Sequence, residues 1–434
     1  MDGVIQYESS TNVRRRWRVD VAAAFTFVAL ASLILDPLFG SAAALIFLLF
    51  GGLVAITRPL ASLIALLRFW YVLILPAYCL LSFFWSQLPP LTLRYAVQFS
   101  ISMVIAIVIA NRVAPLTLLR CLFGIYGMGV VGSLLFGRVR DDIGAWIGIF
   151  GSKNAFAAVV ASFMLAAIAV AFDRSAHTLM RLAALAGLVV SVPLLLAAQS
   201  TGAILVAVPA VGVALAVFAS RRLTRFQKTF MAGTVAAAGC LVALISAGYG
   251  DLLLEKVLNY SGKDVTLTGR TDLWEFGRDM IEQRPLLGVG YQAFWVQGYA
   301  PAEILWAAFG IEPRSGFNFH NTYISNAVEI GIIGVVIQIA ILYGALAGTL
   351  LWALRSPRAE NAFLAAFLTM VVCASYVEVA VFFQFSITTT IATCAFVYAI
   401  RANHAWKAHI QHMRGTPASA GLSPRFEAEL PHPS

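Results

Sequence analysis

Apolar runs of about 20 residues recur along this chain, and they constrain its fold more than any other feature. A helix needs about 20 residues to cross roughly 30 Å of hydrocarbon, and a backbone inside lipid has to satisfy its own hydrogen bonds. Hydrophobic residues make up 60% of the 434 residues and charged residues only 12%, whereas soluble domains carry roughly 25% charged residues. The sequence therefore predicts an all-α polytopic membrane protein.

About twelve of these runs are long enough to be membrane-spanning helices. The first follows a basic segment, residues 1–20, and lacks a convincing cleavage site, so it predicts an uncleaved helix rather than a signal peptide. The end of the chain is rich in Pro, Ser and Ala, so we expect residues 401–434 to be largely disordered. The expected helices are residues 21–36, 39–57, 62–84, 93–110, 114–136, 155–172, 180–198, 201–219, 229–248, 321–353, 361–383 and 385–400.

Basic residues gather in alternate short loops, which is the positive-inside pattern. The pattern predicts a multi-pass inner-membrane protein with both termini in the cytoplasm and residues 249–320 on the outside. The net charge of +9 is then explained more simply by contacts with lipid headgroups than by nucleic-acid binding. The basic residues are Arg58, Arg112, Arg174, Arg221, Arg222, Arg225, Lys228, Arg355, Arg358, Arg401, Lys407 and Arg414.

The long loop, residues 249–320, separates nine expected helices (21–248) from three (321–400) and is the place where chemistry is expected. It is rich in aromatic residues, so we expect it to fold. Thr271–Gln283 has the pattern of an amphipathic helix, with Leu273, Gly277 and Met280 on one face and Pro285 after its end.

The expected external side carries more cations than the positive-inside rule allows. They could pair with nearby acids such as Asp272, although exposed ion pairs are weak evidence for such a role. They could instead bind an anionic ligand, because arginine binds phosphate oxygens bidentately. Arg270 and Arg284 flank the expected amphipathic helix, which suggests two contacts with one diphosphate. The cations are Arg94, Arg138, Arg140, Lys153, Lys256, Lys263, Arg270, Arg278, Arg284 and Arg314.

His320 is the only histidine on the expected external side, at the point where the loop meets the tenth helix. A lone histidine is often structural, but this one stands next to Asn321 and near Arg314 at a membrane boundary, which equally supports a catalytic role. Tyr323 is expected to share its helical face. Glu329 is expected on the opposite face of that helix and is a poorer partner.

Two carboxylates, Glu329 and Glu378, are expected within the membrane, where such groups are often functional; packing beside Asn326 or Tyr376 is the alternative. No metal or cofactor is expected. The five cysteines fall inside apolar runs without metal-ligand spacing and are interpreted as packing residues.

Five motifs follow one another along the chain, and the ordered set is more specific than any single member. They are Phe84–Pro89 with Thr92 and Arg94, Gly151–Asn154, Thr268–Trp274, Arg284–Tyr291, and His320–Tyr323 followed by Glu329 and Gly331–Gly334. The set resembles the signature of the O-antigen ligase and polymerase superfamily, and Gly288–Trp295 is most similar to its exopolysaccharide polymerase branch. The chain departs from the pattern at Ser200–Gly202, where many members have an arginine, and at Ser152, where histidine is common.

The resemblance implies a GT-C-like glycosyltransferase architecture. It implies transfer of a glycan from undecaprenyl diphosphate to an acceptor sugar at the periplasmic face, with inversion and without a metal. Arg270 would hold the diphosphate and His320 would act near the acceptor hydroxyl. The further candidates for substrate binding are Arg284, Lys153, Asn154, Arg94, Asn321, Tyr323 and Arg314. The implied partners are the carrier-linked oligosaccharide, membrane lipids, and a chain-length regulator with export machinery.

Three alternatives to a polymerase remain open. A ligase would pass a finished glycan to lipid A core with the same donor chemistry. A polysaccharide or lipid transporter would also have about twelve helices, but transporters place polar residues near the bilayer midplane. An assembly protein would use the loop only to bind a partner.

Overall fold

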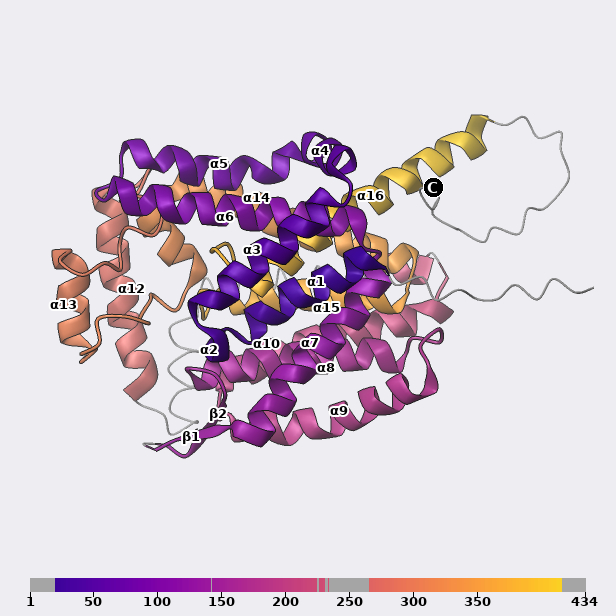
Figure 1. The fold of residues 1–434 in the computed structure, drawn as a ribbon, viewed down its shortest axis with the longest axis horizontal. Coiled ribbons are helices and arrows are strands. Elements are labelled where there is room, and N and C mark those ends of the chain that lie inside the picture. The colour runs from indigo at the N-terminus through magenta and orange to yellow at the C-terminus, as the bar shows by residue number, and fades with distance from the viewer. Residues whose placement is uncertain (1–19, 142, 225, 231–232, 234–264, 416–434) are drawn as a thin grey trace, which may run out of the picture.

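The computed structural model describes residues 20–141, 143–224, 226–230, 233 and 265–415. The helices in the first part of the chain are α1 (Val21–Ile34), α2 (Asp36–Phe39), α3 (Ser41–Ile56), α4 (Pro59–Arg68), α5 (Ile74–Leu81), α6 (Pro89–Arg112) and α7 (Pro115–Phe136). They are followed by α8 (Lys153–Ala171), α9 (Thr178–Ala197), α10 (Thr201–Ala219), α12 (Val265–Gln283), α13 (Ala300–Ala308), α14 (Thr322–Arg355), α15 (Ala359–Ala374) and α16 (Ile387–Gly415). Figure 1 shows this helical arrangement.

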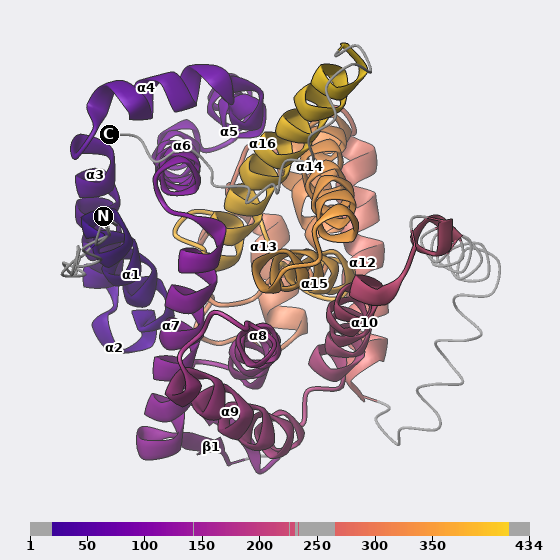
Figure 2. The same cartoon turned by 90° about the vertical axis from the view of Figure 1, so that its right-hand side faces the viewer.

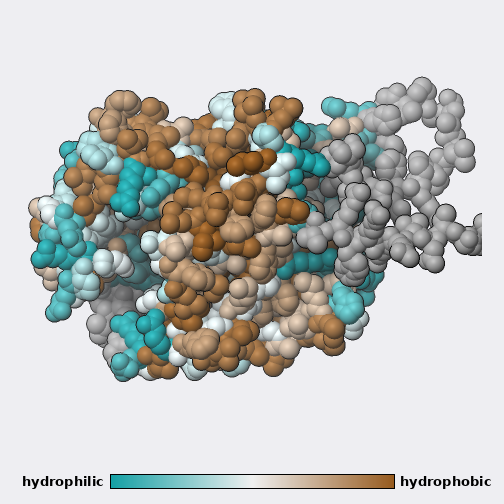
Figure 3. All heavy atoms as spheres, in the orientation of Figure 1, coloured by the Kyte–Doolittle hydropathy of each residue, from teal (hydrophilic) through white to brown (hydrophobic). Residues whose placement is uncertain are grey.

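The described helices have the length and composition of a multi-pass membrane protein. Six of them, α6 to α10 and α14, are long and apolar enough to cross a membrane, and α3 with α4 forms a further apolar pair bent by 99°. Hydrophobic side chains cover the middle of the visible face, and hydrophilic ones gather toward both ends (Figure 3). The total of about twelve spans stays a prediction, because several apolar helices are shorter and most of residues 229–248 lie outside the described residues.

Four expectations about secondary structure need correction. The helix expected at 62–84 is interrupted at Phe69 and continues as a 3-10 turn, Trp70–Leu73, before α5. The helix expected at 361–383 ends at Ala374, and the expected tail is helical as far as Gly415. The fold is also not purely helical, because β1 (Arg138–Arg140) and β2 (Ala145–Gly148) pair as an antiparallel hairpin.

Helix α8 lies inside the bundle. Figure 2 shows it enclosed by α7, α9, α10 and α15, and it contacts each of these four helices. In its most apolar stretch 72% of the residues are buried, so this helix is packed by protein rather than lipid. A polar side chain in its first turn, such as Asn154, therefore has to find partners on neighbouring segments.

The loops rich in basic residues meet one another at one end of the bundle. Arg112 Nη2 donates to Thr57 Oγ1 at 3.4 Å, and Arg221 Nε donates to Pro357 O at 2.8 Å. Arg401 Nη1 donates to the last turn of α6 at 2.8 Å. Loops that were expected to share the cytoplasmic side are thus neighbours in space, which is the arrangement that the charge pattern requires.

Residues 265–320 build a small hydrophobic core together with Val328 of α14. Helix α12 has the expected amphipathic pattern but begins six residues earlier than expected, at Val265. Leu273 and Met280 are 1% and 6% exposed. The buried members of this core are Leu273, Met280, Val289, Phe294, Ala302, Leu305, Trp306, Phe319 and Val328. The described part of the loop is therefore folded onto α14, as its aromatic content predicted.

Helix α14 is broken at Gly331, whose backbone has φ +65° and ψ −178°. The break frees backbone groups that bond to the segment after α12. Ile332 N donates to Pro285 O at 2.8 Å, and Val289 N donates to Val328 O at 3.0 Å. Gly288, at φ +69°, fits here because a Cβ atom would lie 2.5 Å from the Glu329 carbonyl. The glycines of residues 285–291 thus fasten the loop to the broken helix.

Candidate active site

Glu378 joins three residues that are far apart in the sequence. It lies between α15 and α16, and its Oε2 is 2.9 Å from His320 Nδ1. Its Oε1 accepts hydrogen bonds from Asn154 Nδ2 at 2.6 Å and from Arg270 Nη2 at 3.2 Å. One carboxylate therefore brings together three of the residues that the sequence analysis named.

The position of Glu378 is fixed by the first residues of α14. Thr322 Oγ1 donates to Glu378 O at 2.7 Å and accepts from Ala380 N at 2.9 Å. Asn321 Nδ2 donates to Tyr376 O at 3.1 Å, while its Oδ1 caps α14 by accepting from the second and third helical N–H groups. Thr322 and Asn321 thus hold the chain reversal that carries Glu378. Asn321 therefore supports the site through its contact with the backbone of this reversal.

His320 has a left-handed backbone, φ +46°, immediately before the cap of α14. Its N–H donates to Asn318 Oδ1 at 2.7 Å, and Trp274 Nε1 donates to Phe319 O at 2.7 Å, which ties this turn to α12. Since His320 precedes the helix, it shares no helical face with Tyr323. The Tyr323 hydroxyl is instead 3.2 Å from that of Tyr343, so this part of the expectation is wrong.

Arg270 and Asn154 are both held by second contacts. Arg270 Nη1 donates to Val377 O at 3.0 Å, and Asn154 Oδ1 accepts from Ser200 Oγ at 3.0 Å. The side chains of Arg270, His320 and Glu378 are 23%, 26% and 29% exposed. The cluster is therefore ordered by the protein but still reachable from outside.

Helix N-termini add positive potential around this cluster. Ser152, Ser200 and Asn321 cap α8, α10 and α14, and each accepts a hydrogen bond from a backbone N–H of the first turn. Lys153 Nζ donates to Gln199 O at 3.4 Å, beside the cap of α10. A helix N-terminus carries roughly half a positive charge. Arg270 contacts Glu378 directly, and these helix ends and Lys153 add positive groups in the same region, an arrangement that suits an anionic ligand.

The remaining candidates lie away from Glu378. Arg284 is exposed after the end of α12, 14 residues from Arg270, which is about 21 Å along a helix axis. The contact of both arginines with one diphosphate therefore stays a prediction. Arg94 is exposed and lies over the ring of Tyr95, 5.7 Å from its centroid. Arg314 forms an ion pair with Glu303 at 3.5 Å. Roles for these three arginines in substrate binding stay predictions.

Glu378 and Ser200 contribute to the site although neither was among the catalytic or substrate-binding candidates, and Glu378 was expected only as an intramembrane carboxylate of functional or packing role. Glu378 had been placed inside a membrane helix beside Tyr376, whereas it lies in the turn after α15. Its signal was an isolated carboxylate in an apolar region. Ser200 was noted only as a departure from a motif, although a serine before an apolar run predicts a helix cap. In the described part of the chain, no three His, Cys, Asp or Glu side chains are grouped as metal ligands.

Residues 186–339 match a family model described as O-antigen ligase. This segment contains α12, α13 and the beginning of α14, and therefore both Arg270 and His320. Over 280 residues the chain is 37% identical to the exopolysaccharide production protein ExoQ of Rhizobium meliloti (strain 1021). That match covers 62% of this chain and 62% of the relative, so it spans less than two thirds of the relative's length.

Proposed function

We propose that this chain polymerises oligosaccharide repeat units into an exopolysaccharide, a function supported by its similarity to the O-antigen ligase family model and to an exopolysaccharide production protein. The donor is a repeat unit or growing chain on polyprenyl diphosphate, at the periplasmic face of the inner membrane. The observation that carries the proposal is the contact of one carboxylate, Glu378, with both His320 and Arg270. This contact brings together a candidate general base, His320, and a candidate phosphate-binding residue, Arg270.

His320 acts on the acceptor hydroxyl. When Nδ1 carries the proton and donates it to Glu378 Oε2, the Nε2 lone pair is available as a base. The carboxylate also stabilises the imidazolium that forms when Nε2 takes the hydroxyl proton. General-base assistance of this kind is typically worth ~10²- to 10⁴-fold in rate. Glu378 is in this scheme a positioning residue.

Arg270 and Lys153 stabilise the departing diphosphate. The contacts with Glu378 and Val377 use two of the five N–H donors of Arg270, which leaves three to donate to phosphate oxygens. Together with the N-termini of α8 and α10 they supply positive charge where negative charge develops. The positive charge of the reaction thus comes from protein groups, and we propose that it needs no metal ion.

The bond changes balance in one displacement. The acceptor oxygen forms a bond to the anomeric carbon, and the bond from that carbon to the diphosphate oxygen breaks. Its electron pair leaves with the diphosphate, and the hydroxyl proton moves to His320. A single displacement inverts the anomeric configuration. The carrier lipid stays between the helices, and a chain-length regulator and export machinery would act on the product.

Incubation of the purified protein with a lipid-linked repeat unit tests this function. We expect a ladder of longer glycans, and His320→Ala is expected to lose it while the protein stays folded, as measured by its thermal midpoint. A normal ladder from His320→Ala would falsify the catalytic assignment. Product analysis by NMR tests inversion directly.

A ligase is the second candidate, and the description of the matching family model favours it. Donor and leaving group would be the same, and only the acceptor would differ. Offering lipid A core and a second lipid-linked repeat unit in separate reactions distinguishes the two. A product only with lipid A core would replace the polymerase proposal with the ligase.

A further inference from the structure

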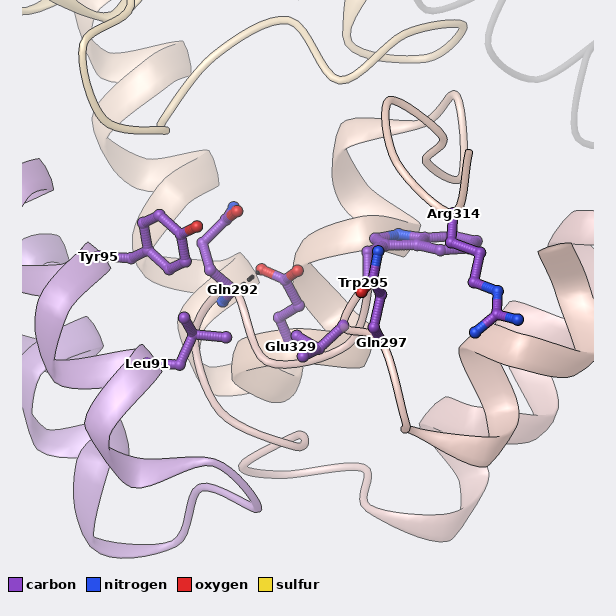
Figure 4. Close-up of a pocket in the computed structure, with 8 residues that line it drawn as sticks. Leu91, Tyr95, Gln292, Trp295, Gln297, Arg314 and Glu329 are labelled. Atoms are coloured by element: carbon purple, nitrogen blue, oxygen red, sulfur yellow. Dashed lines mark hydrogen bonds between the residues drawn. The ribbon is translucent and has the colours of Figure 1, made fainter. Parts of the chain in front are cut away.

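A polar hollow lies between the start of α6, residues 291–297 and α14. It has a volume of about 340 Å³ and is lined by Glu329, Gln292, Trp295, Gln297, Tyr95 and Arg314, among others. In Figure 4 the Glu329 carboxylate lies between Gln292 and Trp295, with Tyr95 on one side and Arg314 beyond Trp295. None of these residues belongs to the Glu378 cluster, so the hollow is a separate feature.

Glu329 is unusual because it is a carboxylate that is only 4% exposed. Gln292 N donates to its Oε2 at 3.0 Å, the single hydrogen bond of this carboxylate within the described residues. Burial of a carboxylate without further donors is costly. Its second oxygen is therefore available as an acceptor for a group inside the hollow. Trp295 Nε1 is also buried and lacks a partner among the described residues.

The same backbone contacts that fasten the loop hold Glu329 in place. Gly290 N donates to Glu329 O at 2.8 Å, and Gln292 has a left-handed backbone, φ +56°, that turns its N–H toward the carboxylate. A strained backbone of this kind persists only where its surroundings stabilise it. The hollow is thus built by the loop and is not an accidental gap.

We propose that this hollow binds a sugar ring of the glycan, an inference that rests on the proposed function. A carboxylate oxygen and two side-chain amides, of Gln292 and Gln297, provide acceptors and donors for neighbouring hydroxyl groups. The rings of Tyr95 and Trp295 provide flat apolar faces for the C–H face of a sugar ring. The volume is at the lower end of the range typical of small-ligand sites, which matches one sugar ring better than a long chain.

The bound ring is not the one that reacts. Glu329 follows Thr322, the first residue of α14, by seven residues, which corresponds to about 10 Å along the helix, and His320 lies before Thr322. This distance exceeds the width of one sugar ring, so the hollow contacts a unit removed from the new bond. Binding there contributes equally to the ground state and the transition state, which lowers KM and leaves kcat unchanged.

Two substitutions test the hollow without disturbing the Glu378 cluster. Glu329→Gln keeps the shape and can still accept from Gln292 N, and Gln292→Ala keeps that N–H and removes only the amide. We expect each to raise KM for the lipid-linked repeat unit up to ~10-fold, the loss of one hydrogen bond, with kcat within about twofold. Glu282→Gln, on an exposed position of α12, is the matched control. A fall in kcat at unchanged KM overturns the proposal.

A binding measurement separates this proposal from the proposed function. The free repeat-unit oligosaccharide, without its lipid carrier, is titrated calorimetrically into wild-type protein, His320→Ala and Glu329→Gln. We expect His320→Ala to bind it like the wild type and Glu329→Gln to bind about tenfold more weakly. Equal binding by all three proteins overturns the sugar site while a glycan ladder still supports the polymerase. Weaker binding by Glu329→Gln in a protein that forms no ladder retains the sugar site and rejects the polymerase.

If only carrier-linked glycan binds, the occupant belongs to a substrate still attached to its lipid. In that case competition by empty polyprenyl diphosphate decides the outcome. Glu329→Gln must then weaken the binding of the carrier-linked glycan and leave the binding of the empty carrier unchanged. An equal loss of affinity for both ligands overturns the proposal that the hollow recognises the sugar.

Discussion

Glu378 contacts side chains from α8, α12 and the turn before α14, so its carboxylate links three independently held segments. Since all three partners are hydrogen-bond donors or can be, the site depends on an acceptor with two oxygens at this position. An ion pair as exposed as Arg270–Glu378 adds little to stability. The cluster therefore contributes by orienting His320 and Arg270 and adds little to the stability of the fold.

Replacement of Glu378 by Gln is expected to lower kcat ~10²- to 10⁴-fold with a smaller effect on KM, because an amide nitrogen facing Nδ1 favours the wrong histidine tautomer. Glu378→Asp should recover part of the rate, since it restores an acceptor. Glu275→Gln, on an exposed position of α12, serves as the control. A merely structural role predicts instead that the thermal midpoint falls together with activity and that Asp gives no recovery.

Arg270→Lys is expected to lower kcat ~10-fold or more, although the charge is retained, because lysine lacks the planar set of donors that contacts Glu378, Val377 and phosphate together. Initial rates measure this effect. Arg278→Lys, on an exposed position of the same helix, should behave like the wild type. Equal rates for Arg270→Lys and the wild type would mean that only the charge matters.

Residue type and expected position outside the membrane were sufficient to predict His320, Arg270 and Lys153 as site candidates, whereas Asn154 was predicted from the family resemblance. Glu378 could not be placed, because the apolar pattern continues through the end of α15. The turn that carries Glu378 uses left-handed residues such as Phe382, φ +69°, instead of glycine or proline. Turn rules rely on those two residues, so only tertiary packing specifies this reversal.

At the scale of elements, the broken helix α14 connects the loop to the membrane domain. The expected range, 321–353, was close to the observed Thr322–Arg355, but the break at Gly331 was not predicted. A glycine in an apolar run is compatible with a continuous helix, and the hydrogen bonds that make the break favourable come from residues 285–290. Helix α13 and the β1–β2 hairpin were also missed, since short elements depend on their neighbours.

Gly331→Ala is expected to lower the thermal midpoint by several degrees and to reduce polymerisation. The left-handed backbone disfavours alanine by about 1–3 kcal/mol, and a Cβ atom would collide with the Leu286 carbonyl. Gly344→Ala is the matched control in the same helix, because its Cβ would meet Phe396 at an ordinary 3.7 Å. Thermal unfolding in detergent measures both. Equal midpoints would show that the break is not required.

The pair Arg120–Asp173 connects α7 to the turn after α8, with Nη2 and Oδ2 2.7 Å apart. Burial by itself raises the pKa of Asp173, but hydrogen bonds from Arg120 and Ser175 and the charge of Arg120 outweigh it, so the net pKa is lowered. A carboxylate whose pKa is lowered in the folded state stabilises the fold at pH values above its pKa in the unfolded chain, about 3.9. This stabilisation is lost as the pH falls through the pKa of the folded state.

Asp173→Asn is therefore expected to lower the thermal midpoint at pH 7 and to have progressively less effect as pH falls below about 4. Thermal scans at a series of pH values measure this. Asp272→Asn, on an exposed position of α12, should show no such pattern. A destabilisation that is independent of pH would assign the effect to packing and not to charge.

At the scale of the whole molecule, the Glu378 cluster and the basic loops occupy opposite ends of the bundle. Lys153 begins α8 and Arg174 follows its end, so about 27 Å of helix separates the two sides. Transporters place their binding groups near the bilayer midplane. A cluster at the ends of α8, α10 and α14 is instead positioned for a substrate at the membrane surface, which favours the glycosyltransferase over a transporter.

The charge pattern adds a direction to this arrangement, because basic loops stay in the cytoplasm. We therefore expect Glu282→Cys, in the last turn of α12, to react with a membrane-impermeant maleimide in intact spheroplasts, and Arg174→Cys to react only after permeabilisation. The native cysteines are replaced by serine beforehand, and each variant must still form glycan. The reverse labelling pattern would place the Glu378 cluster in the cytoplasm. A carrier-linked donor presented at the periplasmic face could not then reach His320, and the proposed reaction would be excluded.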